Sequence, residues 1–530
     1  MKRAWLFFLL ALSLLAGCKE EKVQMLHLKI ASPYELINID PQKIYRSSDY
    51  KILQAAFEGL VVPDPETMLP LPGIAERWTI SPDGMEYKFF LRDNARWSDG
   101  TPVTADDFVF AVKRALSSKF ACASVEVFFS IKNAKEFFNR EMRDFSKVGI
   151  HAINSRMLLI ELESRNPHFM EILTHPCWLP LNPKVVETFK EYDKGYYPHD
   201  VFKTKIISNG PFLFSERIPG TCILLQKNDD YWDAENVLLE WITFSFFEDQ
   251  VEAIKHFSEG ETHLVEISFD GEEVARMHAD NEVEFAPSLE CVGLMFNTAN
   301  PTFKDKDIRR ALSIVINREE LLRRMEKDKR LAAYRFIPPL GDKYTQPLFR
   351  RDVELAKKIL AEAGYGPSNR FPDICILISD IEHPSTVICM EQIQKDWETC
   401  LGIRCHIEQQ DLETFFNRRK TGKFDAIKMS CGGKYRDPAL TVNAFASWDI
   451  KNYGKWQDND YDAIISKIAT NQDFTVRGDL VREAELRLIN QMPVAPLYFN
   501  SHSYLVKSNV SGWFTNISNV HPAKFIYFEK

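Results

Sequence analysis

Cysteines are the residues of this sequence with the widest range of possible chemistry, and there are ten of them. None lies in a Cys-x-x-Cys spacing, and His175, His406 and His502 are scattered without the spacing of a metal site. Cys431 precedes two glycines, but no histidine near it in the sequence could activate its thiol as a nucleophile. The common motifs of serine hydrolases, zinc peptidases and nucleotide-binding proteins are absent. We therefore expect no enzyme, no cofactor and no metal site.

The first residues of the chain have the pattern of an export signal. Lys2 and Arg3 precede an apolar stretch, residues 4–16, that only Ser13 interrupts. This stretch is too short to span a bilayer, which takes about 20 residues, but it suits the apolar core of a signal peptide. No later stretch is long and apolar enough to predict a membrane span.

The end of this segment predicts a lipid anchor. Leu15-Ala16-Gly17-Cys18 resembles a bacterial lipobox, in which the chain is cut before the cysteine, whose thiol and amine become lipidated. We expect a signal peptide over residues 1–17, lipidation at Cys18, and a lipid-anchored tether over residues 18–25. The alternative is a plain signal peptide that is cut near Ala16. Either places the protein outside the cytoplasm, in the periplasm or at the cell surface.

Composition limits what the exported part can be. With 530 residues, 45% of them hydrophobic, the chain can build several cores, and about 150 residues per domain gives three to four domains. The 66 basic and 75 acidic residues give a net charge of −9, which argues against nucleic acid as a partner. Nine cysteines remain after Cys18, an odd number, and we expect most of them to be buried free thiols.

The elements that must position any site form a mixed α/β pattern. Strand-like and helix-like segments alternate in the last third of the chain, which favours α/β layers. The predicted order there is strand 372–379, helix 388–400, strand 403–408, helix 411–420 and strand 424–430. Earlier in the chain, Ser81-Pro82-Asp83-Gly84 predicts the turn of a hairpin, and Thr104 predicts the start of a helix.

Several blocks of the sequence together resemble one family. Trp78, the Ser81–Gly84 turn and residues 90–108 resemble the signature of the extracellular solute-binding proteins of family 5. These are oligopeptide- and dipeptide-binding proteins of ABC importers, with nickel-chelate binders among their relatives. Further blocks agree in family order, namely Phe57–Val61, Asn209–Phe212, Asn228–Trp232, Phe296–Thr298, Asp307–Leu312 and Pro493–Tyr498. We interpret most of this signature as structural, with Trp78, Trp97 and Trp232 in packing and with Arg309 and Arg310 solvated or salt-bridged.

The resemblance implies an α/β clam-shell of the periplasmic-binding-protein type, in which two lobes close over a ligand and the larger lobe carries an extra domain. Domain I would combine residues 26–68, 203–288 and 506–530, domain II would be 69–202, and domain III 289–505. The implied function is to capture oligopeptides or cell-wall peptides and to deliver them to an ABC transporter permease. The protein would act as a monomer that is held at the membrane by its lipid. The alternative ligand on the same fold is a metal chelate or another small anionic solute.

The resemblance also implies the ligand-binding residues. A segment after the first strand would pair with the ligand backbone; Tyr34, Glu35 and Leu36 match it, and Glu35 falls where relatives place an acidic residue near the peptide amino end. A second contact strand covers Ala426 to Gly433 and includes Ser430, Cys431 and Gly432.

The sequence departs from the family pattern just after this strand. Relatives carry an aspartate that pairs with the ligand ammonium, and Lys434 occupies its place here. A lysine repels an ammonium. Glu35 or Asp437 could supply the carboxylate instead, or the ligand could present an anion to Lys434, as a cell-wall peptide rich in carboxylates would. A third possibility is that Lys434 points to solvent.

Two further cations match positions where some relatives bind the ligand's carboxyl end. These are Arg419 and Lys428, and both suit an anion in a closed cleft of low dielectric. The alternative for Arg419 is a solvated helix end, where basic side chains are favoured by the helix dipole.

Overall fold

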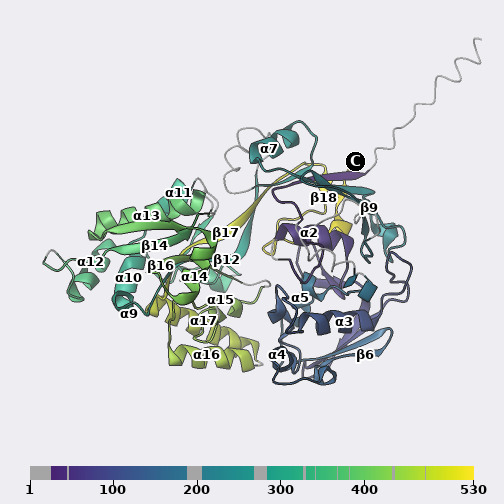
Figure 1. Cartoon of the computed structure of the whole chain (residues 1–530), viewed down its shortest axis with the longest axis horizontal. Coiled ribbons are helices and arrows are strands. Elements are labelled where there is room, and N and C mark those ends of the chain that lie inside the picture. Colours follow the sequence, from purple (N-terminus) through teal and green to yellow (C-terminus); the bar gives the residue numbers. More distant parts are fainter. Residues whose placement is uncertain are drawn as a thin grey trace, which may run out of the picture.

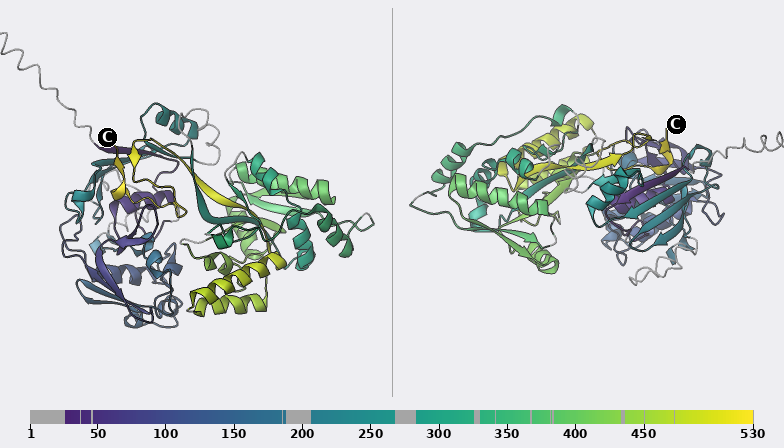
Figure 2. Two further views of the ribbon diagram at one scale, coloured as in Figure 1. Left: turned by 180° about the vertical axis from the view of Figure 1, so that it is seen from behind. Right: turned by 90° about the horizontal axis from the view of Figure 1, so that it is seen from above.

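The chain forms two lobes that are joined by two long strands, as Figures 1 and 2 show. The computed structural model describes residues 26–36, 38–44, 47–184, 186–187, 206–267, 283–325, 330–340, 342–366, 368–380, 382, 384–432, 436–449, 451–471 and 473–529. The joining strands are β12 (Glu284–Phe296) and β17 (Val494–Val506), each 13 residues long. We call residues 26–283 with 507–529 the first lobe and residues 297–493 the second lobe. None of the helices in these described ranges has the length and apolar character needed to span a membrane.

One large sheet runs through both lobes. Among the described residues it contains eleven strands, in the order β15-β14-β16-β12-β17-β11-β1-β10-β9-β8, and β13 (Leu331–Ala332) pairs with β17. The strands on the side of the first lobe are β1 (His27–Ser32), β8 (Phe212–Ile218), β9 (Cys222–Lys227), β10 (Trp241–Phe246) and β11 (Leu264–Ile267). Because β12 and β17 pair along their length at the centre of the sheet, the two lobes share a hydrogen-bonded connection.

The second lobe confirms the alternation predicted from the sequence. Its strands β14 (Ile374–Ser379) and β15 (Cys405–Gln410) run parallel, and α13 (Pro384–Leu401) connects them. The strand β16 (Ala426–Gly432) follows α14 (Leu412–Thr421). The remaining helices are α9 (Pro301–Lys304), α10 (Lys306–Ile314), α11 (Arg318–Arg324), α12 (Val353–Glu362), α15 (Ala439–Asn443), α16 (Asn459–Thr470) and α17 (Phe474–Gln491).

The predicted role of Arg309 was wrong. Its side chain is only 2% exposed, and its guanidinium donates hydrogen bonds to the backbone carbonyls of Phe303 and Gln491. Five fixed N–H donors allow one arginine to satisfy several carbonyls at helix ends, which a sequence pattern of charged residues does not reveal. Arg309 therefore joins α9, α10 and the end of α17.

The lower part of the first lobe in Figure 1 contains residues 78–108, whose sequence carries the resemblance described above. Its four-stranded sheet has the order β4-β5-β7-β6, and Thr104 begins α3 (Ala105–Ala115), as predicted, through a capping box with Asp107. Trp97 is buried and donates from Nε1 to Asp107 at 3.2 Å, which confirms that it packs in the core. The remaining elements of this lobe are α2 (Ser47–Ala56), β2 (Val61–Pro63), β3 (Pro70–Pro72), β4 (Ala75–Ile80), β5 (Glu86–Leu91), α4 (Ala134–Phe138), β6 (Ile150–Asn154), β7 (Met157–Glu161), α5 (Phe169–Ile172), α7 (Gln250–Ser258), β18 (Val510–Ser511) and β19 (Tyr527–Phe528).

Candidate ligand-binding cleft

A cavity of about 480 Å³ lies between the lobes, beside the strands that join them. This volume is in the range of small-molecule and peptide sites. The first lobe contributes Tyr50 and Gln54 of α2, together with residues 174–176 and 517–520. The joining strands contribute residues 288–290 and His502, and the second lobe contributes Arg436. Segments far apart in the sequence therefore enclose one space.

A bulge in the joining strands places Glu290 in the wall of this cavity. The register passes from Pro287 opposite Ser501 to Cys291 opposite Phe499, so three residues of β12 stand against Asn500 alone. Such a bulge bends the strand and redirects its side chains. The Nδ2 atom of Asn500 donates to Oε2 of Glu290 at 2.8 Å, which fixes the carboxylate at the cavity.

Gly432 allows β16 to lie close to this bulge. It pairs with Glu290 across the sheet, and a Cβ atom at this position would overlap the carbonyl oxygen of Leu289. Only glycine fits such a close approach of two backbones. The side chain of the preceding residue, Cys431, is buried opposite Cys291, and all nine cysteines of the described residues are free thiols.

The strand β16 has an unpaired edge next to the cavity. It pairs with β14 only at Ala426 and Ile427, whereas it pairs with β12 as far as Gly432. Among the described residues, no strand continues the sheet beside residues 428–432 on the β14 side. The free backbone groups of such an edge can pair with an extended peptide.

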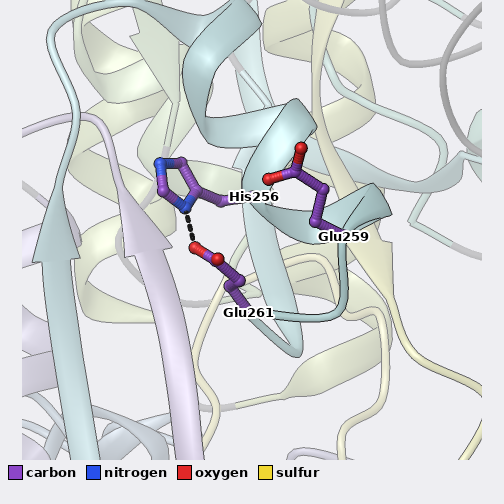
Figure 3. Close-up of side chains that lie close together, drawn as sticks. All are labelled: His256, Glu259 and Glu261. Carbon is purple, nitrogen blue, oxygen red and sulfur yellow. Dashed lines mark hydrogen bonds and ion pairs between the residues drawn. The ribbon is translucent and has the colours of Figure 1, made fainter.

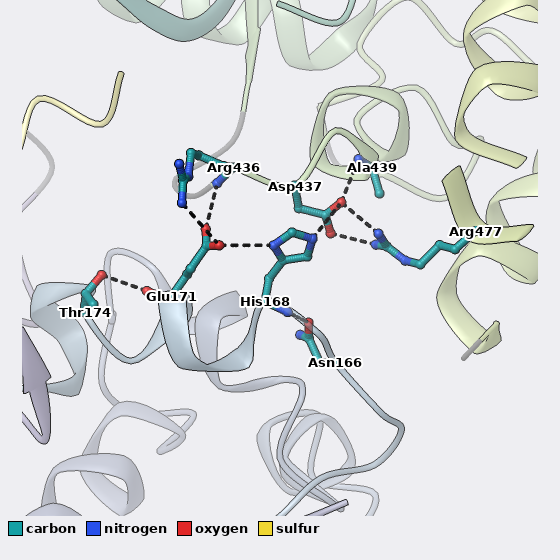
Figure 4. Close-up of polar contacts among 8 residues, drawn as sticks. All are labelled: Asn166, His168, Glu171, Thr174, Arg436, Asp437, Ala439 and Arg477. Carbon is teal, nitrogen blue, oxygen red and sulfur yellow. Dashed lines mark hydrogen bonds and ion pairs between the residues drawn. The ribbon is translucent and has the colours of Figure 1, made fainter. Parts of the chain in front are cut away.

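Opposite the joining strands, ionic contacts connect α5 of the first lobe to the loop that follows β16 (Figure 4). The backbone N–H of Arg436 donates to Glu171 at 3.4 Å, and its guanidinium lies 3.8 Å from the same carboxylate. His168 lies between Glu171, at 3.6 Å, and Asp437, at 3.9 Å. Burial opposes the charge on Glu171, but His168 and Arg436 outweigh it and lower the pKa of this carboxyl. The lobes are thus in contact on both sides of the cavity.

His502, one of the two histidines that line the cavity, is uncharged at neutral pH. Burial, together with the nearby cations Lys51 and Arg330, lowers the pKa of His502 to about 4 despite the opposing charge of Glu266. The Nδ1 atom of His502 lies 3.2 Å from the side-chain nitrogen of Asn519. His502 therefore offers the cavity a neutral imidazole.

A second cavity, of about 520 Å³, lies on the second lobe beside β16. It brings together three of the predicted site residues, Arg419, Lys428 and Ser430. The Arg419 guanidinium lies 4.7 Å from the ring centre of Phe416, and Lys428 donates to Glu382 at 2.5 Å. Ser430 lines this second cavity, and two residues further along β16, Gly432 pairs with Glu290 of the first.

The predicted segment after the first strand lies differently. The carboxylate of Glu35 is paired with Arg217 and accepts from the backbone N–H of Gly220 at 3.0 Å. Leu36 is buried in the core of the first lobe, and Tyr34 is 53% exposed. None of the three lines the cavity between the lobes.

The remaining predicted residues divide into two groups. Asp437 is buried and receives two hydrogen bonds from Arg477, at 2.9 and 2.6 Å, so its charge is already balanced. Lys434, the predicted partner of an anionic ligand, and Cys18, the predicted lipidation site, lie outside the described residues. Sequence reasoning missed Glu171 and Glu290, because no motif marks them and each is placed by distant segments.

One group among the described residues has three side chains that could hold a metal ion. His256, Glu259 and Glu261 lie at the end of α7, with one ligand atom of each within 4.8 Å of the others (Figure 3). His256 pairs directly with Glu261, and Lys255 lies 3.9 Å from Glu259. These residues do not line the cavity between the lobes.

Known proteins share this sequence and this arrangement. The chain is 28% identical over 491 residues to the periplasmic oligopeptide-binding protein OppA of Salmonella typhimurium, covering 90% of this chain and 88% of that protein. It is 27% identical over 508 residues to the periplasmic murein peptide-binding protein MppA of Escherichia coli, covering 94% and 92%. A solved structure of the Escherichia coli murein tripeptide binding protein MppA matches with a TM-score of 0.80 at 26% identity, over 96% of this chain and 99% of that one.

The family model named bacterial extracellular solute-binding proteins, family 5 Middle, matches residues 70–471. The matched residues make up most of the chain, and the two-lobed fold agrees with the solved relative. The chain belongs to the bacterial extracellular solute-binding proteins of family 5.

Proposed function

We propose that this protein captures peptides between its two lobes and delivers them to the permease of an ABC importer. The observation that carries the proposal is the cavity between the lobes, bounded by the joining strands on one side and by the contacts of Arg436 with Glu171 on the other. Closure of two lobes around such a space removes the ligand from water. The relatives reported above are named for oligopeptides and murein peptides, and not for metal chelates or small anions.

Peptide recognition would use the free edge of β16. An extended peptide beside residues 428–432 would continue the sheet through backbone hydrogen bonds, which do not depend on side-chain identity. At the Lys428 end of this edge, Arg419 supplies positive charge for the peptide's carboxyl end, and Lys428, which is paired with Glu382, would add to it by exchanging that partner for the ligand. Ser430 would lie within reach of the same ligand, because it lines the second cavity.

We propose cell-wall peptides as the finer ligand class. Such peptides carry more carboxylates than ordinary oligopeptides. This chain places Arg419 at one cavity, together with Lys428 in its pair with Glu382, and Arg436 at the other cavity, where it contacts Glu171. Lys434 adds a further cation in the sequence between β16 and Arg436. The relative from Escherichia coli that is named for murein peptides aligns over 94% of this chain.

The proposal includes a lipid anchor at Cys18 and a tether over residues 18–25 that holds the folded part near the permease. It also includes a binding role without catalysis, and a division into domain I (26–68, 203–288 and 506–530), domain II (69–202) and domain III (289–505).

The lipid anchor can be tested by itself. Replacing Cys18 with alanine should move the exported protein from the detergent-soluble membrane fraction to the aqueous fraction. An unchanged distribution would contradict the anchor.

The ligand class is tested by thermal denaturation of the chain from residue 19 onward. We expect pools of synthetic tri- and tetrapeptides, and muramyl-type peptides above all, to raise the melting temperature, because a ligand that binds only the folded state stabilises it. Nickel chelates and phosphate serve as controls for the alternative ligands. Stabilisation by a chelate but by no peptide would contradict the proposal.

A further inference from the structure

The candidates among the described residues for receiving a cationic group of the ligand are the carboxylates of Glu35, Asp437, Glu171 and Glu290, and of these Glu171 and Glu290 line the cavity between the lobes. The first three already have cationic partners. Glu35 is paired with Arg217, Asp437 with Arg477, and Glu171 contacts Arg436. A carboxylate that is held by a guanidinium has its charge balanced and its hydrogen-bonding capacity partly used. The fourth, Glu290, is different.

Glu290 lines the cavity, and its partner is a neutral amide. Asn500 Nδ2 donates to one carboxylate oxygen, Oε2, at 2.8 Å, and no described lysine, arginine or histidine forms an ion pair with Glu290. A carboxylate can accept about four hydrogen bonds, so most of the capacity of Glu290 remains open. In a closed cleft of low dielectric, a negative charge without a cation is costly and favours a positively charged ligand group.

The position of Glu290 along the sheet identifies which ligand group would meet it. Glu290 pairs with Gly432, the last residue of β16, whereas Lys428 begins the free edge of the same strand. A peptide along this edge would thus meet the Glu290 carboxylate at one end and the Arg419 guanidinium, beside the Lys428–Glu382 pair, at the other. Opposite charges at the two ends select one direction, with the amino end of the peptide at Glu290.

We propose that Glu290 receives the ammonium group of the bound peptide. It would take the role of the aspartate that relatives carry at the position of Lys434. This inference rests on the proposed function and adds to it the residue that selects ligands with a free amino end. Asn500 acts as a positioning residue, because its amide holds the Glu290 carboxylate toward the cavity.

The test compares two pools of the same synthetic tri- and tetrapeptides, one with free amino ends and one N-acetylated. The full exported chain is freed of co-purified ligand, incubated with each pool and desalted, and the retained peptides are quantified by mass spectrometry. Wild type should retain the free-amine pool about 10- to 100-fold better, which corresponds to one hydrogen bond with a charged group. Glu290→Gln should lose this preference, and Glu290→Asp should keep part of it.

Glu284→Gln is the matched control, because Glu284 is an exposed carboxylate on the same strand that does not line the cavity. Equal melting temperatures of the variants show that each has folded. If Glu290→Gln retains peptides and still prefers the free-amine pool as wild type does, the role of Glu290 is refuted while the peptide-binding function stands. If wild type retains neither pool, both the function and the role of Glu290 are refuted.

Discussion

Arg477 holds Asp437 in a two-pronged ion pair, with Nη1 to Oδ1 at 2.9 Å and Nη2 to Oδ2 at 2.6 Å. Asp437 is 5% exposed and also accepts the backbone N–H of Ala439 at 2.9 Å. The pair joins α17 to the loop that carries Arg436, so it supports the wall of the cleft on the side of the second lobe.

Arg477→Ala should therefore destabilise the second lobe. Removing one partner of a buried ion pair leaves an uncompensated charge, which costs about 3–5 kcal/mol. Chemical denaturation followed by circular dichroism measures the change, with Arg482→Ala, an exposed arginine on the same helix, as the control. If the two variants unfold at the same denaturant concentration, the structural role of the Asp437 pair is refuted.

Gly432→Ala should impair both folding and ligand binding. A methyl group here would overlap the Leu289 carbonyl and push β16 away from the bulge that carries Glu290. We expect a loss of several degrees in melting temperature and weaker peptide retention. Gly478→Ala is the control: nothing lies near its added methyl, and alanine in a helix is favoured by about 1 kcal/mol, so its melting temperature should rise slightly. A Gly432→Ala protein that binds peptide normally would contradict the close packing.

The contact between Glu171 and Arg436 should depend on pH. The pKa of Glu171 is lowered by His168 and Arg436 despite burial, so the contact is fully present above the ordinary value near 4.5 and is lost as the pH falls through the lowered pKa. Small-angle X-ray scattering of the ligand-free protein should show a larger radius of gyration for Glu171→Gln than for wild type at pH 7.

Two comparisons make that measurement specific. Glu141→Gln changes an exposed carboxylate away from the cavity and should scatter like wild type. Wild type below the pKa of Glu171 should approach the dimensions of the Glu171→Gln variant. Identical scattering of Glu171→Gln and wild type at pH 7 would show that this contact does not hold the lobes together.

His502 should make the protein less stable in mild acid. Its folded-state pKa is lowered to about 4 by burial, whereas the unfolded chain takes up the proton near pH 6.5. Stability is therefore lost as the pH falls from 6.5 toward 4, by at most about 1.4 kcal/mol for each pH unit. His502→Gln should reduce this slope in urea unfolding between pH 7 and pH 5. An unchanged slope would contradict a buried neutral imidazole.

The sequence predicted those features that depend on neighbouring residues. The alternation of β14, α13, β15, α14 and β16 follows from local apolar patterns and was confirmed within a few residues. The capping box at Thr104 has the same local origin. Family motifs then predicted the two-lobed architecture, because several blocks occurred in the expected order.

The cleft was predicted less completely, for a physical reason. Glu290 is positioned by Asn500, 210 residues away in the sequence, and by a bulge that no motif marks. Arg309 was expected on the surface, because a charged helix pattern does not show which backbone carbonyls need donors. Glu35 matched a family position, yet its carboxylate is paired with Arg217. Local patterns do not contain these long-range pairings.

The central claim is that one peptide occupies the cleft between the lobes. Native mass spectrometry of the exported chain, freed of ligand and mixed with the synthetic peptide pool, measures this directly. We expect every complex to carry the added mass of one peptide per protein chain, and we expect an excess of a muramyl-type peptide to displace the bound peptides. Spectra that show only the free protein at every peptide concentration would contradict the binding of a peptide between the lobes.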